Sequence, residues 1–197
     1  MDRVARIGPN ALLQLVPVLD RALGVAERTA LFARADVPVP PPDAGMWPEA
    51  EVARLHRAVV QAAPDLAPGV LRAAGLGTAD YILANRIPRA AKAVIRALPA
   101  PLGARALTMA IAKHSWTFAG SGRFSVAARA PLTLTIAANP LACGAGRAPS
   151  CHWHAAVFER LYSTLVWPTA QVLETACCAC GDAACRFEIA PRAELPS

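Results

Sequence analysis

The sequence predicts an α+β fold in which helices pack on an antiparallel β-sheet. Residues 9–118 of the 197-residue chain show mostly helical patterns, and alternating apolar and polar segments follow in two pairs with one more helix between them. Helices followed by paired strands are typical of an α+β domain. Hydrophobic residues make up 55% of the chain, so it can bury a substantial core.

The chain opens with helical patterns that end at a proline-rich connector. Residues 9–24 predict one helix and residues 26–35 predict a shorter second one. The stretch VPVPPPDAG at residues 37–45 cannot continue a helix. We therefore expect residues 1–45 to form an N-terminal helical arm with a linker, and residues 46–197 to form the main α+β domain.

Four more helices are expected before the first strand. Residues 48–62, 68–85 and 88–98 each carry a helical pattern, and Pro48 suits the first turn of its helix. The fourth helix is predicted over residues 102–118 and stops at the glycines that follow it. Its apolar face collects residues at helical spacing: Leu107, Ile111, His114 and Phe118.

The pattern then changes to alternation. Residues 124–128 and 132–136 alternate apolar and more polar side chains and predict an antiparallel pair of strands. Residues 151–166 predict a helix. Residues 170–178 and 184–190 predict a final pair of strands joined by a tight turn.

Cysteines crowd the C-terminal part of the chain. There are six: Cys143, Cys151, Cys177, Cys178, Cys180 and Cys185. Thiolates bind zinc well, and a carboxylate such as that of Glu174 can complete a tetrahedron. The residues alone leave several ligand sets open, with buried free thiols as the alternative. We expect a structural Zn²⁺, because four protein ligands leave no open position for a substrate.

The stretch ETACCACGDAACRF, from Glu174 to Phe187, resembles the signature of the 4-vinyl-reductase domain family. That signature has a Glu, a Cys three residues later, a Gly-Asp turn and then Cys-x-Phe. Cys151 lies 23 residues before Glu174, which is the spacing of the zinc ligands in the phenol-sensing members of the family. The resemblance covers roughly residues 100–190. It implies the zinc-ligand set Cys151, Glu174, Cys177 and Cys185.

Two further segments extend the resemblance over nearly the whole chain. HSWTFAGSGRF at residues 114–124 and CHWHAAVFERLY at residues 151–162 resemble the J proteins of bacteriochlorophyll biosynthesis in purple photosynthetic bacteria. This resemblance implies a fold like that of the Bet3 subunits of the TRAPP complex, with helices against an antiparallel sheet, often as a homodimer. It also implies a role at the divinyl-protochlorophyllide stage of pigment synthesis.

Two functions of different classes follow. Vinyl reduction needs a source of hydride or electrons, zinc is redox-inert, and no GxGxxG opens a helix after a predicted strand. We therefore expect a carrier or assembly protein that binds divinyl protochlorophyllide or a related Mg-porphyrin and serves the enzymes of bacteriochlorophyll synthesis. The alternative is an 8-vinyl reductase that uses NADPH or a partner reductant. A small-molecule sensor, as in other family members, is a third option.

A Mg-tetrapyrrole needs an apolar cleft, accepts one axial ligand, and carries carboxylates that cations at the rim can bind. The candidate residues for such a site are His114, Trp116, His154, Arg86 and Lys113. Each has a structural alternative, because histidine and tryptophan on apolar helix faces are often core residues and basic side chains often only face solvent.

The charge is unevenly distributed. The net charge is +6, and no Asp or Glu occurs from Tyr81 to Phe158. This basic segment predicts a surface for ligand carboxylates, anionic lipid or an acidic partner, and the lack of interleaved aromatics argues against nucleic acid. No run of 18 apolar residues and no signal-peptide cleavage site occurs. We expect a cytoplasmic protein, with peripheral contact at the inner or photosynthetic membrane as a second option.

Overall fold

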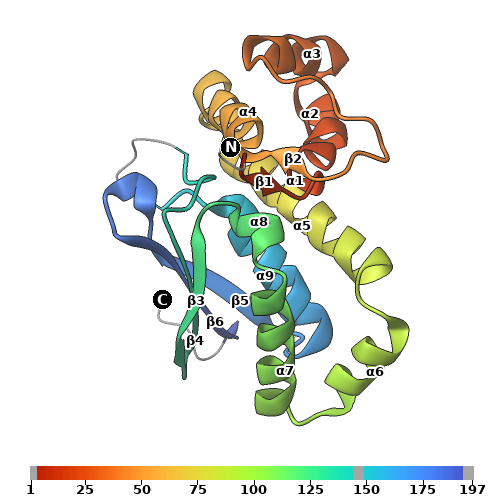
Figure 1. Ribbon diagram of the computed structural model, residues 1–197, viewed down its shortest axis with the longest axis vertical. Helices are drawn as coiled ribbons and strands as arrows, with labels where there is room; N and C mark the ends of the chain where they lie inside the picture. Colours follow the sequence, from red (N-terminus) through yellow and green to blue (C-terminus); the bar gives the residue numbers. More distant parts are fainter. Residues whose placement is uncertain (1–3, 144–148, 193–197) are drawn as a thin grey trace.

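The computed structural model describes residues 4–143 and 149–192. Helices gather on one side of the molecule and a four-stranded antiparallel sheet lies on the other, with the long helix α9 (His152–Leu165) between the sheet and α5 (Ala67–Asn85) (Figure 1). This arrangement confirms the predicted α+β class. Within the described residues, no helix is both long and apolar enough to cross a membrane.

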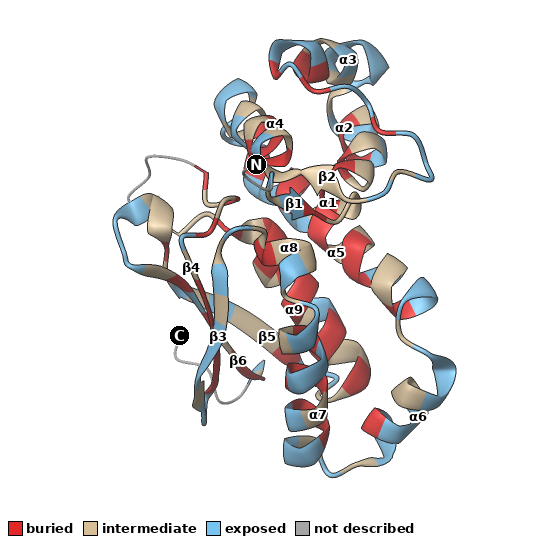
Figure 2. Cartoon of the chain, viewed as in Figure 1, coloured by how far each residue is buried: buried red, intermediate tan, exposed pale blue. Residues whose placement is uncertain are grey.

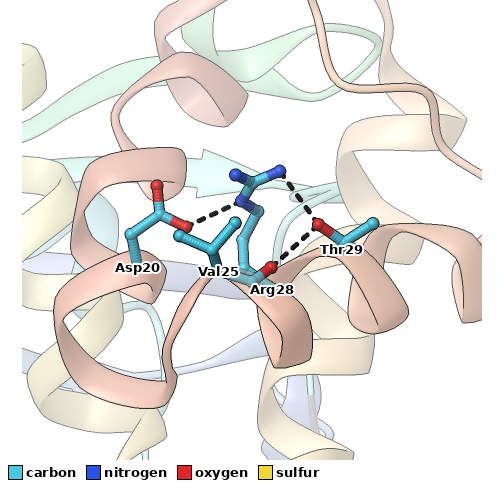
Figure 3. Close-up of polar contacts among 4 residues, drawn as sticks. All are labelled: Asp20, Val25, Arg28 and Thr29. Carbon is cyan, nitrogen blue, oxygen red and sulfur yellow. Dashed lines mark hydrogen bonds and ion pairs between the residues drawn. The ribbon is translucent and has the colours of Figure 1, made fainter.

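The N-terminal part contains three helices, and the chain turns sharply at Gly24 between the second and the third. They are α1 (Asn10–Leu13), α2 (Leu15–Leu23) and α3 (Val25–Arg34). Gly24 has a φ of 87°, a conformation that glycine adopts without strain. Across this turn, Arg28 Nε donates to Asp20 Oδ1 at 2.9 Å, and within α3 Thr29 Oγ1 donates to the Val25 carbonyl (Figure 3). The ion pair links α3 to α2.

A two-strand ribbon, which the sequence analysis missed, returns the chain to its N-terminus after the proline-rich connector. It pairs β1 (Arg6–Ile7) with β2 (Trp47–Pro48), and α4 (Glu49–Ala62) follows at once. Strands of two residues are too short to give an alternating pattern. Buried residues from both sides of residue 45, such as Leu12 and Leu71, belong to one contiguous core. The division into an arm and a main domain at that residue stays a prediction.

The predicted helix over residues 102–118 is wrong at its C-terminal end. Three helices occupy residues 89–119, namely α6 (Arg89–Ala97), α7 (Ala100–Lys113) and α8 (Trp116–Ala119). His114 ends α7 with φ −109° and ψ 13°, and α8 then turns so that the Thr117 carbonyl accepts the Gly8 N–H at 2.7 Å. This bond to the N-terminal segment favours the break. His114 therefore leaves the apolar face and is exposed to solvent.

The sheet has the order β3-β4-β6-β5, with every neighbouring pair antiparallel. Its strands are β3 (Arg123–Arg129), β4 (Leu132–Ala137), β5 (Ala170–Ala176) and β6 (Ala184–Pro191). The core between the sheet and α9 contains Leu134, Phe158 and Phe187, all almost fully buried. Figure 2 shows buried segments along α9 and within the sheet. The two predicted strand pairs are thus observed, and β6 from the second pair lies beside β4 from the first.

Candidate metal centre

Four side chains meet where α9 begins beside the β5–β6 hairpin. They are Cys151, Glu174, Cys177 and Cys185, and one potential ligand atom from each lies within 4.8 Å of all the others. Cys151 is the residue before the first turn of α9, Glu174 is on β5, Cys177 follows β5 and Cys185 is on β6. The structure therefore brings together the four residues that the sequence analysis named as metal ligands.

An irregularity in β5 lets Glu174 and Cys177 reach the same cluster. Residues three apart on a regular strand point to opposite faces of the sheet. The pairing of β5 with β6 shifts between Glu174 and Ala176, as it does at a β-bulge. The extra residue turns the chain by one position, so Cys177 faces the same side as Glu174. The short 3₁₀ turn over Cys178–Cys180 then leads back to Cys185.

The sulfur atoms are spaced as a metal ion would require. The Sγ–Sγ distances are 3.4 Å for Cys151–Cys185, 3.7 Å for Cys151–Cys177 and 4.0 Å for Cys177–Cys185. Zinc bound tetrahedrally at about 2.3 Å per sulfur would separate the sulfurs by about 3.8 Å. All six cysteines of the chain are free thiols. The geometry of the cluster thus fits a tetrahedral ion.

Neighbouring N–H groups point at the sulfur atoms. Asn139 Nδ2 donates to the Sγ atoms of Cys151 and Cys185, both at 3.4 Å, and the backbone N–H of Cys178 donates to Cys185 Sγ at 3.3 Å. Such donors stabilise sulfur as thiolate, which is the form that binds metals. The sequence analysis missed Asn139, because a loop asparagine 12 residues before Cys151 gives no local signal.

Glu174 has one carboxylate oxygen that the described structure leaves without a partner. Its Oε2 accepts the Cys151 N–H at 2.8 Å, while Oε1 is buried and makes no hydrogen bond. Burial raises the pKa of Glu174 to about 7. A buried, unpaired carboxylate oxygen is uncommon in folded proteins, and a cation among the sulfurs would satisfy it.

Hydrogen bonds among the three thiols shift their pKa values in opposite directions. Hydrogen bonds from Cys151 and Cys185 hold the pKa of Cys177 far below its ordinary value, whereas its hydrogen bonds with Cys177 and Cys185 raise the pKa of Cys151. One thiolate is therefore favoured and the others are held protonated. Binding of a divalent cation would release those protons and make all three thiolates available as ligands.

The other cysteines lie outside this cluster of four. Cys143 is buried, its Sγ donates to the Leu141 carbonyl at 3.0 Å, and burial raises its pKa to about 12. Cys178 is half-buried and Cys180 is exposed. The CxxC spacing of Cys177 and Cys180 alone would have paired those two residues, but the fold directs Cys180 to solvent.

The residues predicted to bind a tetrapyrrole do not form one pocket. Lys113, His114 and Trp116 are exposed around the junction of α7 and α8, with Trp116 58% exposed. Arg86 lies separately at the end of α5, with its guanidinium 5.7 Å from the centre of the Tyr81 ring. His154 is 1% exposed and sits in the core, with Nε2 3.3 Å from the Phe118 carbonyl. Burial therefore separates His154 from the other four residues.

None of the five predicted residues lines either of two cavities in the described part of the chain. One, of about 290 Å³, lies beside the cysteine cluster between α5, α9 and β5, and Arg72, His152 and Glu174 are among its lining residues. The other, of about 360 Å³, lies between α2 and α5. Ligand sites for larger organic molecules usually enclose about 300–1,000 Å³, so both are small for a macrocycle.

The sequence of this chain is similar to those of known proteins. Residues 132–191 match the V4R domain family, and all four cluster residues lie in that range. The chain is 59% identical over 188 residues to the "Bacteriochlorophyll synthase 23 kDa chain" of Cereibacter sphaeroides, covering 95% of this chain and 91% of that one. It is 54% identical over 191 residues to the protein of the same name in Rhodobacter capsulatus, covering 97% and 90%.

Two crystal structures of H-NOX proteins have a similar fold. The protein from S. oneidensis has a TM-score of 0.56 and that from K. algicida one of 0.62, each at 11% identity and over 93% of this chain. The alignments cover 98% and 95% of those two chains. At this level of identity the likeness shows a common fold and nothing about ligands.

Proposed function

Because this chain belongs to the family of the bacteriochlorophyll synthase 23 kDa chains and so acts in bacteriochlorophyll biosynthesis, we propose that it binds and carries a Mg-tetrapyrrole. Divinyl protochlorophyllide or a related Mg-porphyrin is the proposed cargo, and the enzymes of the pathway are its proposed partners. We also propose that the protein is a cytoplasmic homodimer.

The exposed imidazole of His114 is the observation that carries this proposal. Its Nδ1 lies 3.2 Å from the Ala110 carbonyl oxygen, which can only accept a hydrogen bond. In the neutral ring Nδ1 therefore carries the hydrogen, and Nε2 keeps a lone pair. An exposed imidazole in this tautomer can bind the Mg²⁺ of a tetrapyrrole from one side of the ring.

The surroundings of His114 suit the rest of such a ligand. The exposed indole of Trp116 offers an apolar surface for the flat ring. Lys113 is exposed next to His114, and no acidic residue lies within 30 residues of it on either side. The lysine can pair with a carboxylate at the edge of the ring.

We further propose that Cys151, Glu174, Cys177 and Cys185 hold a structural Zn²⁺. The support is the spacing of the sulfurs, the N–H donors from Asn139 and the unpartnered Glu174 oxygen. A bound zinc ion would offset part of the negative charge of the thiolates and fasten the start of α9 to the β5–β6 hairpin, and it would supply no electrons.

An absorbance titration with divinyl protochlorophyllide tests the carrier function. We expect a shifted Soret band on binding and no loss of the vinyl group when NADPH is present. The variant His114→Ala should bind more weakly and without the shift of the axially ligated pigment, and added imidazole should restore that shift. Arg34→Gln, an exposed change on α3, is the control and should bind as the unmodified protein does.

Two results would contradict this proposal. An unchanged spectrum and affinity in His114→Ala would exclude His114 as the axial ligand. Conversion of the pigment to its monovinyl form over many turnovers would establish the 8-vinyl reductase instead.

A further inference from the structure

The outer face of α7 is apolar and basic at the same time. Leu102, Arg105, Met109 and Lys113 recur at helical spacing and so share one side of the helix. Leu102 is 52% exposed and Met109 is 64% exposed, while the opposite side of α7 is buried through Leu107 and Ile111. We call these four residues the α7 outer face. The eleven residue steps from Leu102 to Lys113 make it about 16 Å long.

Two neighbouring helices also expose basic or apolar side chains. On α6, which packs against α7, Arg89 and Arg96 are exposed and Val94 is 59% exposed. Trp116 on α8 is 58% exposed just beyond the other end of the α7 outer face. Figure 2 shows long exposed stretches on α6 and α7 at one end of the molecule.

No negative charge offsets these cations from the same elements. The chain has no Asp or Glu from Tyr81 to Phe158, a range that includes α6, α7, α8, β3 and β4. Within the part of the chain that the structure describes, the ion pairs are formed by other residues, so Arg89, Arg105 and Lys113 are not among them. The face therefore presents a positive potential to solvent.

We propose that the α7 outer face, flanked by α6, docks on the surface of an anionic phospholipid bilayer. Basic side chains that alternate with exposed leucine and methionine can hold lipid headgroups while the apolar side chains enter the acyl boundary. An acidic protein partner is the competing occupant, and vesicle flotation separates the two because it contains no second protein. The arginines of α6 need not lie in the plane of the α7 outer face, because the electrostatic attraction between a basic side chain and the lipid headgroups reaches about 8 Å at physiological salt.

Vesicle flotation with the full-length protein and no pigment tests this surface, so its outcome is independent of tetrapyrrole binding. The vesicles are pure phosphatidylcholine or an equimolar mixture with phosphatidylglycerol. Three double variants are compared with the unmodified protein: Arg89→Gln with Arg105→Gln, Leu102→Ser with Met109→Ser, and the control Val25→Ser with Arg21→Gln. The control changes an exposed arginine on α2 and an exposed valine on α3.

We expect the protein to float with the anionic vesicles, to bind the neutral vesicles far less, and to dissociate in high salt. Each arginine contributes about fivefold in affinity, so the arginine variant should bind about 30-fold more weakly. The leucine–methionine variant should lose about tenfold or more, and the control nothing. Circular dichroism should show the same fold in all variants.

The proposal fails if the unmodified protein floats with neither vesicle, or if the control variant loses as much binding as the other two. It also fails if the α7 variants bind vesicles normally but change the sedimentation coefficient of the protein. That last result would identify the α7 outer face as a contact between two copies of the chain.

Discussion

Replacing Gly75 by alanine should force apart the two helices at the centre of the molecule. Gly75 lies on the face of α5 that packs against α9. A Cβ atom added there would clash with the Trp153 carbonyl oxygen and lie 2.8 Å from the Ala156 Cβ. Both neighbours are short and rigid, so no flexible side chain can move aside. The helices would have to separate by about 1 Å to restore ordinary van der Waals contact.

The expected net loss is about 2 kcal/mol. Overpacking of a core contact costs about 1–3 kcal/mol, and two contacts this short favour the upper end. Alanine gains about 1 kcal/mol over glycine inside a helix, which offsets part of the loss. For a chain of this length, 2 kcal/mol lowers Tm by about 4–8 °C.

Gly69→Ala is the matched control in the same helix. An added Cβ at Gly69 meets nothing within 4 Å, so only the gain in helix propensity remains. That variant should be more stable by up to about 1 kcal/mol. The same substitution, glycine to alanine, should thus lower the stability at residue 75 and raise it at residue 69 of the same helix.

Urea unfolding followed by circular dichroism measures both variants. Because Cys151 immediately precedes α9, movement of α9 in Gly75→Ala should also weaken metal binding, which a competition with a chromophoric chelator would detect. If Gly75→Ala were as stable as the unmodified protein, the close approach of α5 and α9 would be refuted. Equal destabilisation by Gly69→Ala would refute the attribution to packing.

Three further predictions concern the cluster and a buried histidine. Cys177→Ser should lose most of the bound zinc and the stability that depends on it, whereas Cys180→Ser should keep both. Elemental analysis measures the zinc and thermal unfolding measures the stability. A fully folded, metal-bound Cys177→Ser would show that the ligand assignment is wrong. Asn139→Ala should lower zinc affinity about 10–100-fold in chelator competition, and an unchanged affinity would mean that its N–H···S contacts do not matter. His56 is fully buried with its pKa lowered by burial to about 4, so only the unfolded state takes up its proton between pH 6.5 and 4. The contribution of neutral, buried His56 to stability is therefore fully present above pH 6.5 and falls by about 3 kcal/mol as the pH drops to 4. In His56→Gln, the free energy of unfolding should change less steeply with pH over this range.

The sequence by itself determined the fold class and most helices and strands. Periodicity located α4 and α5 to within a residue, because each buries one continuous stripe that spans many turns. It located β4 and β6 through their alternation. The resemblance to the 4-vinyl-reductase domain family also selected the four cluster residues from six cysteines, which spacing alone had left open.

Only the tertiary structure decided which side chains share a site. His114 and His154 both looked like apolar-face histidines, yet the end of α7 exposes the first and the packing of α8 on α9 buries the second. The contact of Asn139 with two sulfurs and the bulge after Glu174 were equally invisible in the sequence. Periodicity reports which side of one element is apolar. It carries no information on where a helix breaks to meet a distant segment, because that choice depends on contacts between residues far apart in the chain.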